Sequence, residues 1–522
     1  MERMLRNLTT VLLLALLCLA LPAAAQRARS AAELDAADNG LLVLSYHDVR
    51  DDVLEKSDAD AYAVSTQNFA AHLDWLSAHG YHPVSLSQLI KASRGEAKLP
   101  PRPVLLTFDD GLRSVYSRVY PLLRAYNYPA LVAVITDYVD MAPGRTIDYG
   151  YRPFGHDDFL TWDQLREMQA SGLIELASHT DNLHHGVQSN PQGNQTPAVI
   201  TRIYDPKAQR YESAQEYEKR LRDDLGRSVQ RIEKELGVRP KAIVWPYAAY
   251  NQLSNDIAEQ LGMPVSFDLE GRSTPVTADL HGLARLLVTS NPNITSLAFE
   301  LRRNVNLDGT RALQIDMDSV YDSDPAQQAR NLDALIERVK RIGPTHVYLQ
   351  AFADPDGNNT ADALYFPNRH LPMRADLFNR VAWQLKTRAG VKVYAWLPVL
   401  GYELPDAAQR AALGIQSPER DGMYRLDFTK PQARQIIKDI YEDLAINSYF
   451  EGLLFHDDGY VRDTELTQLP QEGSDGGRTQ ALIDFTLELR DSAQRWRPKL
   501  GAVRNLYAQP VLEPQSAAWF AQ

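Results

Sequence analysis

Two short polar segments carry the side chains that could do chemistry. Asp109 and Asp110 stand side by side before Gly111, and His179 and His184 lie five positions apart in a second segment. A carboxylate and two imidazoles that leave positions open for water and substrate form the ligand set of a catalytic metal ion rather than a structural one. Alone, an Asp-Asp-Gly sequence is typical of a turn, and loop histidines are commonly solvated. The two segments therefore argue for a metal site only in combination.

Both segments follow apolar runs that predict buried strands. Residues 103–108 precede the aspartates and residues 173–177 precede the histidines. Continuous apolar runs suit strands covered on both faces, and their alternation with helical spacing predicts a parallel α/β barrel. In such folds the carboxyl ends of the strands carry the site, which is where both polar segments fall. The other apolar runs and helical segments of this half of the chain are residues 41–45, 67–79, 130–135, 212–236 and 242–245.

The combination resembles the NodB-type polysaccharide deacetylases, the carbohydrate esterase family that includes chitin and peptidoglycan deacetylases. The resemblance implies a deformed (β/α) barrel, with Asp109 as general base and Asp110, His179 and His184 as ligands of one divalent metal ion. Zn²⁺ is the default cofactor, and an Asp-His-His site also accepts Ni²⁺, Co²⁺ or Fe²⁺. A divalent ion polarises an acetamide carbonyl and acidifies its bound water, while a free carboxylate beside it removes the proton.

A further segment fits the same family. Trp245-Pro246-Tyr247 looks like the family's Arg-Pro-Tyr-Gly motif, in which the tyrosine backbone N–H helps to hold the tetrahedral oxyanion. Trp245 stands where arginine is common, which puts the family's Asp–Arg pairing in doubt. Arg285 is a candidate substitute partner for Asp109 or Asp268, although an exposed surface arginine is the commoner fate of such a residue.

The family's late Leu-x-His segment, which carries the general acid, is not found after Arg285. Instead, the early His47 and the later Asp268 resemble the subgroup that deacetylates poly-β-1,6-N-acetyl-D-glucosamine, a biofilm exopolysaccharide. In that subgroup His47 would protonate the leaving amine, and Asp268 is a candidate to orient and charge it. A single histidine at a strand end is more often a structural residue.

The second half of the chain repeats the strand and helix alternation. It resembles the glycoside-hydrolase-like barrel that is fused to the deacetylase in those exopolysaccharide proteins. Only five strands are predicted, and an eight-stranded barrel takes about 250 residues, so we expect this (β/α)₈-type barrel to be truncated or open. Carboxylates beside aromatic rings suit a sugar-binding or glycosidase site, with Asp457 the first choice for an acid or base; a binding groove without hydrolysis is the alternative. The candidates at the strand ends are Asp316, Asp318, Asp354, Glu403, Asp457 and Asp458.

The N-terminal residues and the composition indicate the cellular location and the class of ligand. Residues 1–25 have the charged, apolar and small-residue layout of a signal peptide, with lipidation of Cys18 as an alternative. We therefore expect export to the periplasm or outer membrane of a Gram-negative bacterium, where an export porin is a candidate partner. The formal net charge of -12 disfavours nucleic acid and suits a neutral or cationic ligand. The expected layout is a signal peptide (1–25), a deacetylase domain (41–290), a linker (291–308) and the second barrel (309–522).

Three functions remain open. The first is deacetylation of poly-N-acetylglucosamine, and the second is deacetylation of another amino-sugar polymer such as peptidoglycan or chitin. The third is a polysaccharide-binding protein or glycosidase whose N-terminal site is vestigial.

Overall fold

The computed structural model describes residues 40–54, 58–269, 273–274, 279–302, 309–415, 423–462, 464–466, 469 and 477–505. The expected signal peptide and Cys18 lie outside these residues. No helix within the described ranges has both the length and the apolar character that a membrane span requires.

A curved, mainly parallel sheet forms the first compact unit. Its strand order is β15-β14-β9-β6-β5-β1-β16, in which only β16 is antiparallel to its neighbour, and β17 and β4 add to β1 and β5. Every residue of β1 and β5 is buried, which confirms strands covered on both faces. The strands are β1 (Leu41–Tyr46), β4 (His82–Pro83), β5 (Pro103–Phe108), β6 (Ala130–Val134), β9 (Ile174–Ser178), β14 (Ala242–Val244), β15 (Val265–Phe267), β16 (Ser273–Thr274) and β17 (Leu286–Leu287).

Alternate residues of the strands pack in two separate hydrophobic cores. Leu44 and Leu106 pack with apolar residues of the surrounding helices, whereas Val43 and Leu105 join a second cluster with residues of β14 and β15. This alternation is the period of two that a strand imposes. The helices between residues 40 and 302 are α2 (Thr66–Ala78), α3 (Leu86–Ser93), α4 (Tyr120–Tyr126), α5 (Thr136–Val139), α6 (Trp162–Ala170), α7 (Ala214–Leu236), α8 (Gln252–Gln260) and α9 (Ile294–Arg302).

Residues 280–287 connect the two edges of the sheet. At one end, Leu283 N–H donates to the carbonyl of Ser266 (2.8 Å), and Asp268 N–H donates to the carbonyl of Leu283 (3.0 Å). At the other end, Leu286 in β17 pairs with β1. This bridging segment brings the intervening residues, Arg285 among them, across the interior of the fold.

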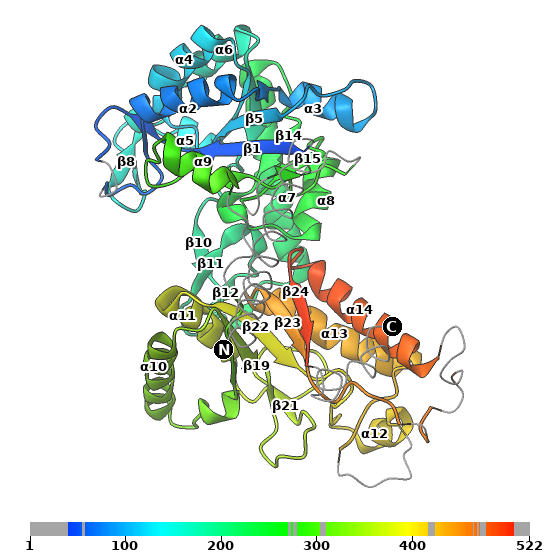
Figure 1. Cartoon of the computed structure of the whole chain (residues 1–522). Helices are drawn as coiled ribbons and strands as arrows, with labels where there is room; N and C mark the ends of the chain where they lie inside the picture. Colours follow the sequence, from blue (N-terminus) through cyan, green and yellow to red (C-terminus); the bar gives the residue numbers. More distant parts are fainter. Residues whose placement is uncertain are drawn as a thin grey trace, which may run out of the picture. The chain divides into compact units, whose positions relative to one another are not determined.

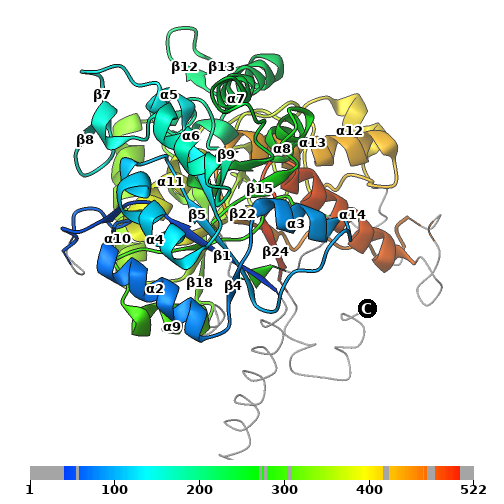
Figure 2. The same ribbon diagram turned by 90° about the horizontal axis from the view of Figure 1, so that it is seen from above.

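The expected linker, residues 291–308, contains an ordered helix. α9 lies beside α2 (Figure 2), and its Leu297 is buried in the same core as β1 and β5. Asn291 accepts a hydrogen bond from the Ser65 N–H (2.9 Å), which fixes the start of the segment. Residues 291–302 therefore complete the first unit, and residues 303–308 lie outside the described part.

The second compact unit comprises residues 306–522 together with residues 185–222 and 249–257. Its main sheet has five strands, the number that the sequence predicts, all parallel in the order β18-β19-β22-β23-β24 (Figure 1). They are β18 (Ala312–Ile315), β19 (His346–Gln350), β22 (Lys392–Leu397), β23 (Gly452–Phe455) and β24 (Gly501–Arg504), and the helices are α10 (Pro325–Ile342), α11 (Phe378–Ala389), α12 (Ala407–Leu413), α13 (Pro431–Asn447) and α14 (Arg478–Gln494).

Local sequence explains the ends of the helices in this unit. The carboxylate of Asp324 accepts hydrogen bonds from the N–H groups of Ala326 and Gln327, and Pro325 occupies the first turn of α10. Gly343 ends α10 in the left-handed conformation (φ 64°). The apolar faces of α10, α11, α13 and α14 share one core with the sheet.

Candidate metal centre and active site

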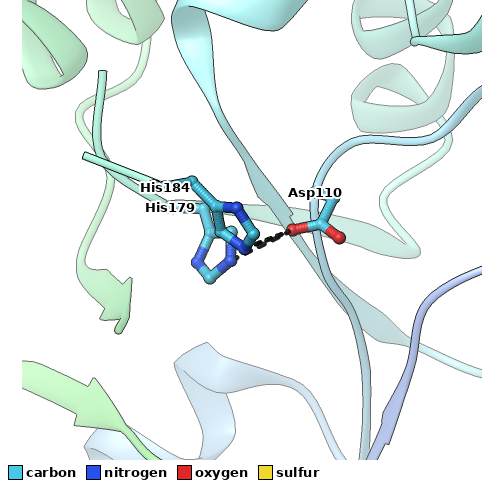
Figure 3. A group of neighbouring side chains, drawn as sticks. All are labelled: Asp110, His179 and His184. Atoms are coloured by element: carbon cyan, nitrogen blue, oxygen red, sulfur yellow. Dashed lines mark ion pairs between the residues drawn. The ribbon is translucent and has the colours of Figure 1, made fainter. Parts of the chain in front are cut away.

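Three predicted ligands converge at the carboxyl ends of two strands. Asp110 follows β5, and His179 and His184 follow β9. The Nε2 atoms of His179 and His184 lie 3.2 and 3.4 Å from Oδ1 of Asp110, and Figure 3 shows both imidazoles facing this one oxygen. Ligand atoms that share a tetrahedral ion at about 2.1 Å stand roughly 3.4 Å apart. The spacing of the three atoms therefore fits one cation.

The backbone turns sharply where these ligands stand. Asp110 and Thr180 have left-handed φ angles of 66° and 74°, which cost non-glycine residues on the order of 1–3 kcal/mol and occur mainly at functional sites. Gly111 follows with φ 72°. The Nδ1–H of His179 donates to the carbonyl of Val244 (2.7 Å), and this bond leaves Nε2 directed at Asp110.

The charge states of Asp110 and His184 suit a divalent ion. Oδ1 of Asp110 is buried and has no hydrogen-bond partner, a costly arrangement unless a cation satisfies it. Burial by itself raises the pKa of Asp110, but His184 and His179 outweigh burial and hold that pKa below its ordinary value. Burial lowers the pKa of His184 to about 4. Asp110 is thus anionic and His184 neutral at neutral pH, the states in which they bind metals.

Asp109 faces a different partner from its neighbour. Both its oxygens accept hydrogen bonds from the guanidinium of Arg285, at 2.7 and 2.8 Å, and both side chains are buried. Burial acts to raise the pKa of Asp109, but the charge of Arg285 and its hydrogen bonds more than compensate, so the net pKa lies below the ordinary value. The Asp–Arg pair that Trp245 put in doubt is formed by Arg285.

The remaining predicted residues of this site lie around that pair. Nε2 of His47 is 3.9 Å from Oδ2 of Asp109, and its ring packs against Tyr62 with centroids 5.2 Å apart. Asp268 is buried, and its backbone carbonyl accepts a hydrogen bond from Nε of Arg285 (2.8 Å). Asp109 is thus a carboxylate close to His47, and the backbone carbonyl of Asp268 holds Arg285.

Comparison with known proteins matches each half of the chain to a family. Residues 96–266 match the family described as Polysaccharide deacetylase, and residues 314–472 and 474–522 match the one described as Hypothetical glycosyl hydrolase family 13. The poly-β-1,6-N-acetyl-D-glucosamine N-deacetylase of Escherichia coli (strain K12) is 37% identical over 514 residues, which cover 93% of this chain and 76% of that protein. The chain belongs to this poly-N-acetylglucosamine deacetylase family.

Two solved structures are also similar to parts of the chain. A de-N-acetylase from Aggregatibacter actinomycetemcomitans is 40% identical and covers 49% of this chain and 98% of its own, with a TM-score of 0.46. The PgaB (BpsB) glycoside hydrolase domain from Bordetella bronchiseptica is 47% identical and covers 40% of this chain and 68% of its own, with a TM-score of 0.37.

The two aromatic residues of the predicted oxyanion segment have different places in this family member. Trp245, which the motif also made a candidate substrate residue, is completely buried and belongs to the core. Tyr247 is half exposed, has a left-handed φ of 57°, and lies with its ring centroid 4.5 Å from that of His184. Tyr247 thus stands at the solvent side of the metal ligands.

Sequence reasoning missed two tyrosines at the deacetylase site. The hydroxyl of Tyr149 donates to Oδ2 of Asp110, and that of Tyr138 donates to the carbonyl of His184 (3.4 Å). Both lie between β6 and α6, a region without an apolar period, so no sequence signal marked them.

Two adjacent carboxylates of the glycoside-hydrolase-like half differ in hydrogen bonding and in solvent exposure. Asp458 accepts hydrogen bonds from the N–H groups of Val399, Leu400 and Gly401, and it is completely buried. Asp457, next to it, is exposed. Asp458 therefore shapes the loop after β22, and Asp457 is the one of the two with a carboxylate open to solvent.

The other four candidate carboxylates also differ in their contacts. Asp318 accepts hydrogen bonds from the Tyr365 hydroxyl, from Arg374 and from the Asp354 N–H, and Asp316 accepts one from the Asp318 N–H (2.8 Å). Asp354 lies in a group with Asp356 and Asp362, and Glu403 forms a long ion pair with Arg410 (3.8 Å). Asp316, Asp318 and Asp354 therefore cluster near the end of β18.

Proposed function

We propose that this chain hydrolyses N-acetyl groups of poly-β-1,6-N-acetyl-D-glucosamine during export of the polymer and biofilm formation, at a metal centre made by Asp110, His179 and His184. The observation that carries the proposal is the convergence of two imidazoles on a buried, unpaired carboxylate oxygen, next to a second carboxylate that faces an arginine. Family membership supplies the substrate class.

The three ligands suit Zn²⁺ best, and Ni²⁺, Co²⁺ or Fe²⁺ can occupy the same donors. When bound, such an ion polarises the acetamide carbonyl and lowers the pKa of a coordinated water. Side chains and backbone groups of this chain carry out the proton transfers and bind the oxyanion.

Asp109 is the proposed proton acceptor. Its depressed pKa keeps it ionised at neutral pH, and the two-point ion pair with Arg285 fixes its orientation. His47, whose Nε2 lies 3.9 Å from Oδ2 of the same carboxylate, is the proposed donor of a proton to the departing amine. The backbone N–H of Tyr247 is the proposed donor to the oxyanion.

The second half is proposed to bind, and to cleave, the partly deacetylated polymer. Deacetylation exposes ammonium groups, which carboxylates attract, and aromatic rings stack on sugar faces. Asp457 is the candidate acid or base because it is exposed whereas Asp458 is fully occupied by the backbone. We place the protein in the periplasm or at the outer membrane, with an export porin as its partner.

The test is acetate release from defined β-1,6-linked N-acetylglucosamine oligomers, after chelation and after restoring each candidate ion separately. We expect release that chelation abolishes and an added ion restores. β-1,4-linked chitin oligomers and peptidoglycan fragments, assayed in parallel, separate this function from that of another amino-sugar deacetylase. No release from any polymer with each ion supplied would refute the proposal.

A further inference from the structure

The two oxygens of Asp110 have unlike surroundings. Oδ2 accepts a hydrogen bond from the hydroxyl of Tyr149. Oδ1 has no hydrogen-bond partner and faces the Nε2 atoms of both histidines. A phenol that donates to one carboxylate oxygen competes with a chelating metal for that oxygen, so the free oxygen is the favoured ligand.

The ring of Tyr149 is held in place by a local aromatic cluster. It stacks on Phe154, with centroids 4.3 Å apart and planes at 20°, and meets the edge of Phe159 at 6.5 Å. Phe154 lies on β8 (Pro153–Gly155), which pairs with β7 (Thr146–Asp148) in a hairpin. Both phenylalanines are buried, so the hydroxyl has little freedom to leave Asp110.

The same cluster is tied to the backbone of the metal site. The N–H of Leu160 donates to the carbonyl of Gly111 (2.8 Å), directly after Asp110, and Leu112 bridges Phe159. Tyr138, which packs on Phe159 at 5.0 Å, donates to the carbonyl of His184. Residues 135–160 therefore contact two of the three ligands from outside the metal centre.

We propose that Tyr149 is a positioning residue for the metal centre: it orients Asp110 for binding through Oδ1 alone, and the hairpin of β7 and β8 holds it there. This inference rests on the proposed metal site. Groups that hydrogen-bond to metal ligands commonly change metal affinity about 10- to 100-fold when removed.

Tyr149→Phe tests the inference because it keeps the stacked ring and removes only the hydroxyl. The matched control is Tyr151→Phe, whose ring meets Phe154 edge-on at 5.6 Å in the same hairpin. Zn²⁺ affinity of the full chain is measured by competition with a chromogenic chelator. We expect Tyr149→Phe to bind about 10- to 100-fold more weakly and Tyr151→Phe to bind like the wild type.

A second readout reports the coordination itself. Freed from Tyr149, both oxygens of Asp110 can reach the ion, so the Co²⁺-loaded variant should show weaker visible absorption, as expected for a higher coordination number. Phe154→Leu, which keeps the hydroxyl but removes its stacking partner, should give a smaller loss of affinity. Equal affinity and an unchanged Co²⁺ spectrum in Tyr149→Phe would overturn this inference alone, whereas a wild-type chain that binds neither ion would overturn the metal site as well.

Discussion

Asp109 and Asp110 are adjacent, yet their surroundings give them different tasks. Asp109→Asn removes the proton acceptor but no ligand, so we expect kcat to fall by about 10²- to 10⁴-fold with metal affinity unchanged. Asp110→Asn should lower metal affinity and activity together, with partial recovery in excess ion. Metal titrations and acetate release on both variants check the division. Loss of metal binding in Asp109→Asn would reverse the two roles.

The Asp109–Arg285 pair also bears on stability. Both side chains are buried, and breaking such a pair typically costs about 3–5 kcal/mol because one charge stays unpaired. We expect Arg285→Met to lower the unfolding free energy by that order in urea titrations of the metal-free chain. Arg113→Met, which removes a partly exposed arginine, is the control and should cost much less. Similar losses in both variants would contradict the argument.

At the scale of single residues, the sequence predicted what lies in contiguous motifs. Asp109, Asp110, His179 and His184 each follow a buried strand, and parallel strands deliver their carboxyl ends to one edge. Arg285 was named as a candidate partner of Asp109 or Asp268, and it pairs with Asp109 in the structure. Tyr149 lies in the short β7 and β8 hairpin, and no sequence pattern marked it. Asp268 was named from the family resemblance as a candidate to orient His47, and that role stays a prediction; its backbone carbonyl accepts a hydrogen bond from Arg285.

A carboxylate on α7 holds the loop between the two predicted histidine ligands through hydrogen bonds. The carboxylate of Asp224 accepts hydrogen bonds from the N–H groups of Asp181 (2.9 Å) and Asn182 (3.0 Å), and burial raises the pKa of Asp224 to about 6. The ordinary pKa of this carboxyl is 3.8, so between about pH 4 and pH 6 the folded state binds more protons than the unfolded state. Stability from this group is therefore present below pH 4 and declines as the pH rises to 6.

Asp224→Asn tests this sign. Other carboxylates titrate in the same range, so the informative quantity is the difference in unfolding free energy between wild type and variant across the pH range. We expect the wild type to lose stability relative to the variant between pH 4 and pH 6. Parallel curves for the two proteins would show that Asp224 does not titrate in this window.

Two glycines test how elements pack. A Cβ on Gly452 in β23 would lie 2.1 Å from the ring of Tyr394, so Gly452→Ala should destabilise the second unit by about 1–3 kcal/mol. Gly226 lies inside α7 with open space around its Cα, so Gly226→Ala should instead stabilise by about 0.5–1 kcal/mol. Thermal unfolding of both variants measures the contrast, and shifts of the same sign would contradict it.

Strands and helices were predicted correctly where the apolar pattern covers many residues. They were missed where the pattern covers only a few. The five strands of the second sheet were expected, and β19, β22 and β23 among them are runs with residues buried on at least one face. The β7 and β8 hairpin is short and largely exposed, so it left no pattern. The sequence did not predict α9, because Asn291-Pro292-Asn293 indicates a turn. In the structure, these three residues come directly before the helix.

At the scale of the whole molecule, the two proposed chemistries belong to two compact units, and they should separate experimentally. Asp110→Ala removes a metal ligand, so deacetylation should stop while binding of a glucosamine-containing β-1,6 oligomer persists. Asp457→Asn should keep acetate release and lose cleavage of that oligomer, read as the distribution of product lengths. Because carboxylates attract the ammonium groups, oligomer binding should also weaken as salt rises. Loss of oligomer binding in Asp110→Ala would mean that the polymer is held at the metal centre, and cleavage that survives Asp457→Asn would move the acid or base to another carboxylate.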